Sequence, residues 1–198
     1  MVNVITFLDI LVVLINLKSA ILGLLAFVSY VFVYTPLKQI TPWAVFVGAF
    51  PGAIPPFLGA IAATDAFGFV PGVLFFVQFT WQFPHFWAIG WFLYDDYKKA
   101  GFFMLPTGNK DKKTALQTIL YTFWTILASV IPAFGFTGKL FLSKPAVVVV
   151  VLLGIWMLYY AFKLHKEMDV KAARKLMLVS VSYISLLQIV YVLDKFLR

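Results

Sequence analysis

Long uncharged stretches alternate with short charged segments along the whole chain, a pattern typical of proteins that cross a membrane several times. Each long stretch is close to or above the roughly 18 residues that a helix needs to cross a bilayer. Six such stretches are present, at residues 19–37, 39–64, 66–94, 114–138, 145–162 and 176–193. A shorter seventh stretch, 3–17, contains Asp9 and lacks the basic start and the cleavage site of a signal peptide. The pattern predicts an all-α, polytopic transmembrane helical bundle of about seven segments, in one domain over residues 1–198.

Composition agrees with that class. Of the 198 residues, 63% are hydrophobic and only 12% are charged, which a water-soluble protein of this size would not tolerate. The net charge is +8, but the basic residues are scattered at the ends of the spans, so nucleic acid is not an expected partner. Cysteine is absent, which excludes disulfides and thiolate metal sites.

Lysine and arginine are distributed unevenly between the two sides of the predicted bundle. Eleven of the 16 fall on one side, which are Lys38, Lys98, Lys99, Lys110, Lys112, Lys113, Lys163, Lys166, Lys171, Arg174 and Lys175. The other side holds Lys18, Lys139, Lys144, Lys195 and Arg198. Cytoplasmic loops are enriched in Lys and Arg, so the richer side is predicted to be cytoplasmic and the C-terminus to lie outside. The membrane expected is a bacterial inner membrane, with the active site on its cytoplasmic side.

The segment 81–106, WQFPHFWAIGWFLYDDYKKAGFFMLP, concentrates the candidate chemistry. Asp95 and Asp96 follow an apolar span, and paired carboxylates of this kind can hold a divalent cation. Lys98 and Lys99 can bind the phosphates that such a cation bridges. The segment therefore predicts a site for a phosphorylated and partly apolar substrate. The alternative is that these charges only keep a loop in water.

Polar residues also lie within the preceding span. At 100° per residue Gln78 and Gln82 lie within roughly 60° of His85, and Asp96 returns to within about 20° of it, although Pro84 is expected to bend the helix. Intramembrane polar residues mark ligand paths, so His85 is predicted to contact substrate; the alternative is interhelical hydrogen bonding.

The span 41–63 carries three prolines, Pro51, Pro55 and Pro56, and is predicted to kink or break. Irregular backbone at membrane depth is tolerated where it borders a cavity, whereas the Gly48 and Gly52 pair predicts close helix packing; both interpretations stay open. Lys38, at the end of another span, is either a membrane anchor or a second hydrogen-bond donor to the phosphates of the substrate.

Several segments in order carry a resemblance to a known family: YVFVYTPLKQITP (30–42), GAFPGAIPPFLG (48–59), WQFPHFWAI (81–89), DDYKKAGFFMLP (95–106), DVKAARKLM (169–177) and LDKF (193–196). They resemble the protoheme IX farnesyltransferases, or heme O synthases, a branch of the UbiA-type intramembrane prenyltransferases. PHFW followed by DDYxxAGxxMLP is far more specific than either motif alone. Two departures are Gln39, where the family usually has arginine, and Phe103, where it commonly has proline.

The resemblance implies a nine-helix fold with a central cavity and two aspartate-rich motifs that bind farnesyl diphosphate through Mg²⁺. The seven predicted segments match the third to ninth spans, and the second motif falls on Asp95 and Asp96. The first two spans and the first motif have no counterpart, so the chain is expected to be N-terminally incomplete: a fragment, a split subunit or a misassigned start. A chain of this kind is expected to be inactive alone.

The implied reaction joins farnesyl diphosphate to a vinyl group of heme B, which is a substrate rather than a cofactor. Asp95 and Asp96 would hold Mg²⁺, and Lys38 would act with them as a catalytic residue on the diphosphate. His85 would contact the heme as an axial ligand or through a propionate. The other expected substrate-binding residues are Tyr34, Trp81, Gln82, Tyr97, Lys98 and Lys99, with Phe86 and Trp87 as further aromatic faces. Implied partners besides the substrates are the lipid bilayer and either heme A synthase or a separate N-terminal half.

Three other functions stay open. A related prenyltransferase acting on a quinone precursor or chlorophyllide would share the diphosphate machinery, although PHFW argues against it. A transporter would explain the broken helices and intramembrane polar residues, but it predicts inverted repeats that the sequence does not show. A catalytically inactive membrane partner is the third.

Overall fold

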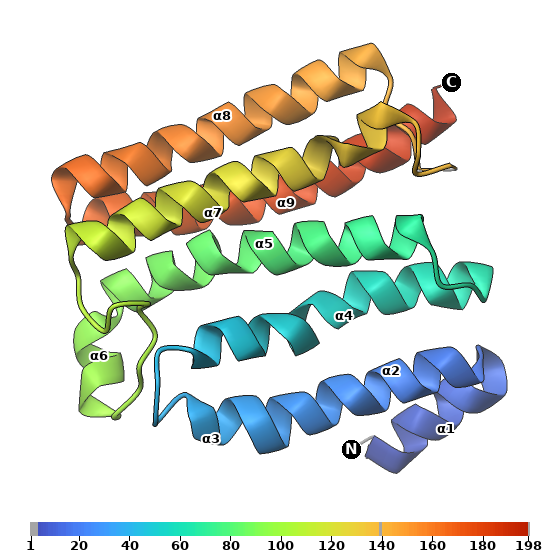
Figure 1. Cartoon of the computed structure of the whole chain (residues 1–198), viewed down its shortest axis with the longest axis horizontal. Helices are drawn as coiled ribbons and strands as arrows, with labels where there is room; N and C mark the ends of the chain where they lie inside the picture. The colour runs from blue at the N-terminus through green and yellow to red at the C-terminus, as the bar shows by residue number, and fades with distance from the viewer. Residues whose placement is uncertain (1–3, 139, 198) are drawn as a thin grey trace.

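The computed structural model describes residues 4–138 and 140–197, and over these residues it consists of helices and loops without a β-strand. The long helices lie side by side with their axes nearly parallel (Figure 1). Each predicted segment corresponds to one helical stretch. These are α1 Val4–Leu14, α2 Leu17–Val28 continued by a π-helical stretch Ser29–Tyr34 and α3 Thr35–Leu37, α4 Ala44–Thr64, α5 Phe69–Phe92, α7 Lys112–Val130 continued by a 3₁₀ turn Ile131–Phe134, α8 Lys144–Glu167 and α9 Val170–Phe196. A short helix, α6 Tyr94–Lys99, was not predicted.

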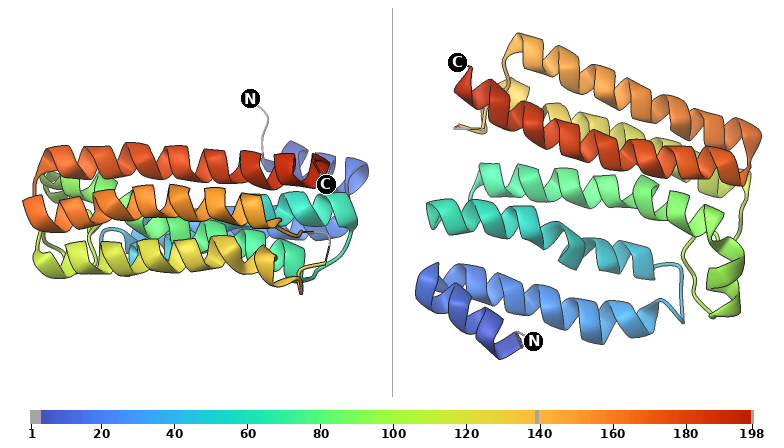
Figure 2. Two further views of the ribbon diagram at one scale, coloured as in Figure 1. Left: turned by 90° about the horizontal axis from the view of Figure 1, so that it is seen from above. Right: turned by 180° about the vertical axis from the view of Figure 1, so that it is seen from behind.

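Five stretches among the described residues are long and apolar enough to span a membrane, which confirms a polytopic bundle: Leu17–Leu37, Ala44–Thr64, Lys112–Phe134, Lys144–Glu167 and Val170–Phe196. The first helix, α1, has 11 residues, or about 16 Å of length, which is short of the roughly 30 Å hydrocarbon core. The remaining helix, α5, has 24 residues but is less apolar, since it carries two glutamines and a histidine. It packs against α4 on one side and against α7 and α9 on the other (Figures 1 and 2), and of these three polar side chains Gln82 is buried while Gln78 and His85 are half-buried.

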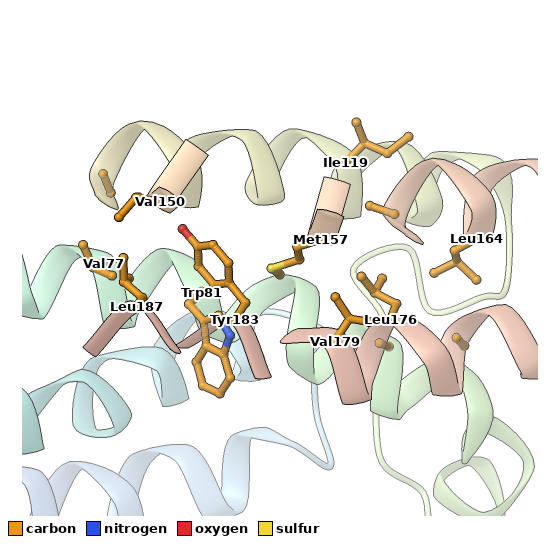
Figure 3. Packing of buried hydrophobic residues seen from close by; sticks show 14 of the residues in the cluster. Val77, Trp81, Ile119, Val150, Met157, Leu164, Leu176, Val179, Tyr183 and Leu187 are labelled. Atoms are coloured by element: carbon orange, nitrogen blue, oxygen red, sulfur yellow. The ribbon is translucent and has the colours of Figure 1, made fainter. Parts of the chain in front are cut away.

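The main hydrophobic core lies between α5, α7, α8 and α9 (Figure 3). Trp81 of α5 and Tyr183 of α9 are buried at its centre, next to Met157 of α8. A second cluster around Phe83, Trp87 and Met104 joins α4 and α5 to the loop that follows α6. The two clusters fix opposite faces of α5, and they thereby hold the helix that carries most of the predicted site.

The prolines of α4 do not break it. Pro51, Pro55 and Pro56 all lie inside one continuous helix, which bends near its middle (Figure 1). The predicted break is therefore wrong and the predicted kink is confirmed. The glycine prediction is also confirmed, since a Cβ at Gly48 would lie 2.6 Å from the Tyr34 ring and one at Gly52 would lie 2.0 Å from Gln82 Oε1.

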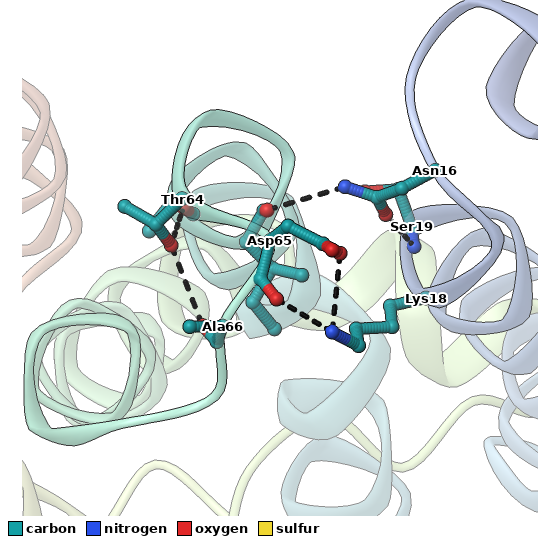
Figure 4. Close-up of polar contacts among 8 residues, drawn as sticks. Asn16, Lys18, Ser19, Thr64, Asp65 and Ala66 are labelled. Atoms are coloured by element: carbon teal, nitrogen blue, oxygen red, sulfur yellow. Dashed lines mark hydrogen bonds and ion pairs between the residues drawn. The ribbon is translucent and has the colours of Figure 1, made fainter.

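The loops gather at two ends of the bundle, as the predicted topology requires (Figure 1). One end carries α3, α6 and the α8–α9 turn. The opposite end holds the α1–α2 turn and the α4–α5 turn. There Lys18 forms a salt bridge of 3.1 Å with Asp65, and the Asn16 side chain donates to the Ile61 carbonyl at 3.4 Å (Figure 4). Of the basic residues used for the topology, Lys139 and Arg198 lie outside the described residues.

Candidate functional site

The acidic pair lies on a separate helix. Helix α5 ends at Phe92, Leu93 leaves the helical conformation at φ −100° and ψ 19°, and α6 runs at a steep angle to α5 (Figure 1). The predicted alignment of Asp96 with His85 on one helical wheel is therefore wrong. Asp95 and Asp96 occupy the first turn of α6 and are exposed, while Lys98 and Lys99 form its last turn.

One of the two carboxylates already has a cationic partner. Lys110 Nζ lies 3.6 Å from Asp95 Oδ2, and the Asp95 side chain is 79% exposed, so solvent screens this pair strongly. Lys110 Nζ and Lys98 Nζ also lie 4.9 and 5.8 Å from the centre of the Tyr94 ring. Carboxylates and ammonium groups therefore stand together on one exposed surface, where an anionic ligand with a bridging cation could engage both.

Lys38 reaches this same region from another helix. Its carbonyl oxygen accepts the backbone N–H of Phe103 at 2.9 Å, and its Nζ lies 4.6 Å from the centre of the Phe102 ring. The Phe102 ring in turn lies 6.3 Å from the ring of Tyr97. Burial raises the pKa of the Tyr97 hydroxyl, so Tyr97 is a neutral hydrogen-bond donor at physiological pH. The structure thus brings Lys38 and Tyr97 together around Phe102.

No group of three or more His, Cys, Asp or Glu side chains forms a metal site within the described part of the chain. Two consecutive carboxylates remain, Asp95 and Asp96. Magnesium is commonly held by only one or two carboxylates together with waters and substrate phosphates, so this donor set fits one side of such a site. It does not form a closed all-protein site.

Two of the predicted substrate-binding residues and one of the further aromatic faces line one small cavity. Tyr34, Gln82 and Phe86 meet around a space of about 110 Å³, which Met104 of the loop after α6 also lines. Gln82 is buried, and its Nε2 donates to the Ala49 carbonyl at 3.0 Å and to the Gln78 carbonyl at 3.2 Å. Gly48 and Gly52 line this cavity as well as permitting close packing, so the span 41–63 both borders a cavity and packs closely, and a substrate in that cavity stays a prediction.

Trp81 and His85 form a stacked pair on another face of α5. Their ring centres are 4.6 Å apart and their planes differ by 16°. Both are attached to Ser180 of α9, since the Trp81 indole donates to its carbonyl at 2.7 Å and His85 Nδ1 lies 2.8 Å from its hydroxyl oxygen. Trp81 is buried and its N–H is occupied, so its polar edge holds α9 while its ring supports the imidazole of His85.

Trp87 stands apart from these residues. It lines a different cavity of about 460 Å³ together with Trp43, Phe83 and Tyr121. Its ring packs edge-on against Tyr121 with the centres 5.0 Å apart. Trp87 is therefore not grouped with Tyr34, Gln82 and Phe86.

Sequence reasoning missed Ser180, Phe102 and Lys110. Ser180 is a polar residue inside an apolar span, a signal that marks hydrogen-bonding or functional positions, but its partner is 95 residues away in the chain. Phe102 and Lys110 both follow the acidic pair closely in sequence, yet their contacts with Lys38 and Asp95 depend on how the loop after α6 folds back.

Comparison with known proteins adds a family. The sequence model of the UbiA prenyltransferase family matches residues 2–187. The protoheme IX farnesyltransferases of Flavobacterium johnsoniae and Christiangramia forsetii are 65% and 63% identical over 184 residues, which is 93% of this chain and 61% of each relative. The protein of the same name from Cytophaga hutchinsonii is 46% identical over 188 residues, covering 94% of this chain and 64% of its own length. No solved structure matches the chain significantly. The chain thus spans about 61% of the length of the first two relatives.

Proposed function

This chain belongs to the UbiA prenyltransferase family, and we propose that it contributes to transfer of a farnesyl group from farnesyl diphosphate to a vinyl group of heme B, giving heme O. The observation that carries the proposal is the meeting of Lys38 with the loop that follows the acidic helix α6, next to an aromatic cavity. The names of the relatives, which are 60–65% identical, support the choice of donor and acceptor.

The charged residues at this end suit a diphosphate. Asp95 and Asp96 offer the carboxylates, and Lys38, Lys98 and Lys99 offer ammonium groups for charge-assisted hydrogen bonds to phosphate oxygens. Magnesium, when bound with the substrate, would supply neutralisation of the leaving diphosphate. The bond between C1 of the farnesyl group and the diphosphate oxygen breaks and diphosphate leaves; C1 bonds to the terminal vinyl carbon of heme B, the oxygen of a water bonds to the other vinyl carbon, and one proton of that water is released.

Aromatic and amide side chains suit the apolar part of the substrate. Tyr34 and Phe86 line the small cavity, and aromatic rings stabilise a developing allylic cation through their faces. Gln82 offers a neutral amide to the same cavity, and Tyr97 offers a neutral hydroxyl beside Phe102. On the α9 side we assign heme B to His85, with the buried Trp81 ring stacked behind the imidazole as its support.

The membrane placement follows from the basic residues. We infer that the α6 end faces the cytoplasm of a bacterial inner membrane and that the C-terminus lies outside, because cytoplasmic loops are enriched in Lys and Arg. A reporter fused near Asn109 is expected to report cytoplasm, and one fused after the last residue is expected to report the outside. Reporters with the opposite sidedness would reverse the placement of the diphosphate site.

The activity is tested in membranes that contain residues 1–198, alone and together with a segment that supplies the two spans and the first acidic motif expected from the resemblance. Conversion of heme B to heme O is followed by chromatography. We expect no detectable product from residues 1–198 alone, because a diphosphate is then clamped from one side only. Product is expected with the added segment, and Asp96→Asn should abolish it together with magnesium-dependent consumption of farnesyl diphosphate. Heme O from residues 1–198 alone would contradict the two-sided clamp, and unchanged turnover in Asp96→Asn would contradict the site.

A further inference from the structure

His85 on α5 and Ser180 on α9 share a hydrogen bond whose direction the geometry determines. His85 Nδ1 lies 2.8 Å from Ser180 Oγ, and the same Oγ lies 2.7 Å from the carbonyl oxygen of Met177. A serine hydroxyl has one proton to donate, and a carbonyl oxygen has none. Two oxygens at hydrogen-bond distance need a proton between them, so the Ser180 proton points to Met177.

The hydrogen of the other contact, between His85 Nδ1 and Ser180 Oγ, must then come from the histidine. Because the Ser180 proton is committed, Ser180 Oγ can only accept, and the hydrogen of that bond lies on His85 Nδ1. The ring is neutral, since no carboxylate of the described residues pairs with it and its neighbours are the Trp81 and Phe86 rings. In a neutral imidazole with hydrogen on Nδ1, Nε2 carries a free lone pair.

This second nitrogen is open to a ligand. Nε2 makes no hydrogen bond to any residue that the structure describes. Among the described residues, the fully buried side-chain atoms that lack a hydrogen-bond partner are Ser19 Oγ and the indole nitrogens of Trp87 and Trp91, so His85 Nε2 is not a fully buried atom. Nε2 therefore lies at the accessible edge of the ring, on the side turned away from Ser180.

We propose that Ser180 is a positioning residue that holds His85 as the Nδ1–H tautomer, so that Nε2 acts as a ligand nitrogen for the iron of the porphyrin acceptor. The proposal rests on the proposed function and selects between the two roles open to His85. A propionate carboxylate only accepts hydrogen bonds, and Nε2 in this tautomer has none to donate. Metal-binding histidines are commonly supported by such a hydrogen bond from the opposite ring nitrogen.

Trp81 completes the arrangement from two directions. Its ring stacks on the imidazole, and its indole N–H donates to the Ser180 carbonyl at 2.7 Å. The stacking fixes the plane of the His85 ring, and the indole bond fixes the α9 backbone that carries the accepting hydroxyl. Orientation of the ring and choice of tautomer therefore depend on one contact between α5 and α9.

The tautomer can be measured without heme or turnover. The chain has two histidines, so His165→Gln leaves His85 as the single imidazole for ¹⁵N NMR of the whole chain in micelles. We expect Nδ1 to show the signature of a protonated ring nitrogen and Nε2 that of a bare one. A wild-type ring with its hydrogen on Nε2 would overturn the inference and leave the proposed farnesyl transfer untouched.

Variants of Ser180 separate the role from general packing. Ser180→Ala should give a mixture of tautomers and weaken binding of ferric heme B about 10- to 100-fold, the range typical of residues that orient metal ligands. Ser180→Thr keeps the hydroxyl and should restore both properties. The matched control is Ser182→Ala, because the Ser182 hydroxyl also donates to a carbonyl of its own helix, that of Leu178, but Ser182 is only partly buried and has no hydrogen bond to His85.

The outcomes separate the inference from the function it rests on. Equal tautomer and equal heme affinity in Ser180→Ala and wild type would overturn the positioning role. If wild type binds heme and the heme spectrum is the same in His85→Ala, ligation of the iron by His85 is wrong. If wild type has the expected tautomer but binds no ferric heme B in the presence of the added N-terminal segment, the heme acceptor of the proposed function is wrong and the ligation falls with it.

Discussion

The backbone N–H of Phe103 donates to the carbonyl oxygen of Lys38 at 2.9 Å, which joins two loops that are far apart in the sequence. One loop ends the helix that contains Tyr34, and the other follows the acidic helix α6. The bond therefore fixes the distance between the two predicted diphosphate-binding groups on different segments. The resembled family commonly has proline at the position of Phe103, and proline has no N–H to donate.

Replacing Phe103 tests this connection. We expect Phe103→Pro to lower the free energy of unfolding by about 1 kcal/mol relative to Phe103→Ala, since only the proline removes the hydrogen bond. Unfolding in mixed micelles of both variants measures the difference. Equal stability of the two variants would mean that the bond to Lys38 contributes nothing measurable.

Close packing at Gly52 gives a second prediction. A methyl group at Gly52 would lie 2.0 Å from Gln82 Oε1, so Gly52→Ala must displace the Gln82 amide and strain its bond to the Ala49 carbonyl. We expect a loss of about 1 to 2 kcal/mol in unfolding free energy, because a buried amide loses its partner. Gly59→Ala on the same helix meets nothing within 4 Å, and it should gain about 0.5 to 1 kcal/mol from helix propensity. A stabilised Gly52→Ala would show that Gln82 moves freely.

Asp111 gives a prediction in pH. It is the N-cap of α7, where its carboxylate accepts the Thr114 N–H at 2.7 Å and the Thr107 hydroxyl at 2.9 Å. Partial burial raises the pKa of this carboxyl, but the hydrogen bonds from Thr114 and Thr107 and the charge of Lys113 outweigh it and lower the pKa below its usual 3.8. The stabilisation is therefore complete above pH 3.8 and is lost as the pH falls through the lower folded value.

The measurement compares Asp111→Ala and Asp111→Asn with wild type over a range of pH. Asp111→Ala should cost about 1 kcal/mol near pH 7, the usual worth of an N-cap. Asp111→Asn still caps but does not titrate, so the advantage of wild type over it should shrink below pH 3.8. An advantage that grows on acidification would contradict the assigned sign.

The helices could be predicted from the sequence because each is coded locally. Uncharged windows marked every long helix, and the start of α9 is fixed just as locally by its N-cap Asp169, which accepts the Ala172 N–H at 2.6 Å. The break in phase at Leu93 could not be read in the same way, because an apolar residue there gives no sign that α5 ends and α6 turns away. The helical-wheel prediction that placed Asp96 on the same face as His85 is wrong because the helical phase breaks at this one residue.

The candidate site was predicted as a set of residue types, but not as a set of contacts. The acidic pair and Lys38 follow from charge and from family resemblance, whereas their connection through Phe102 and Phe103 depends on tertiary folding. The same holds on α7, where Thr118 and Thr122 are buried and each donates to the carbonyl four residues earlier. Such hydroxyls satisfy themselves within the helix, so an apolar window conceals them.

The end of α4 gives a last prediction, because Asp65 has two separable roles. It ends the helix in the left-handed conformation at φ 50°, and its carboxylate pairs with Lys18 at 3.1 Å (Figure 4). Both side chains of the pair are substantially exposed, so the ion pair should contribute less than about 1 kcal/mol. Asparagine and glycine tolerate the left-handed region, whereas a β-branched residue there is strained by about 1 to 3 kcal/mol.

We therefore expect Asp65→Asn and Asp65→Gly to stay within about 1 kcal/mol of wild type in unfolding free energy, and Asp65→Val to lose clearly more. Lys18→Gln removes the ion pair together with the hydrogen bond from Lys18 Nζ to the Asp65 carbonyl oxygen, so high salt should narrow its difference from wild type only by the ionic part. If Asp65→Asn were as destabilised as Asp65→Val, the charge rather than the backbone conformation would dominate at this turn. Because the turn lies at the end of the bundle opposite α6 (Figure 1), none of these variants should change heme affinity.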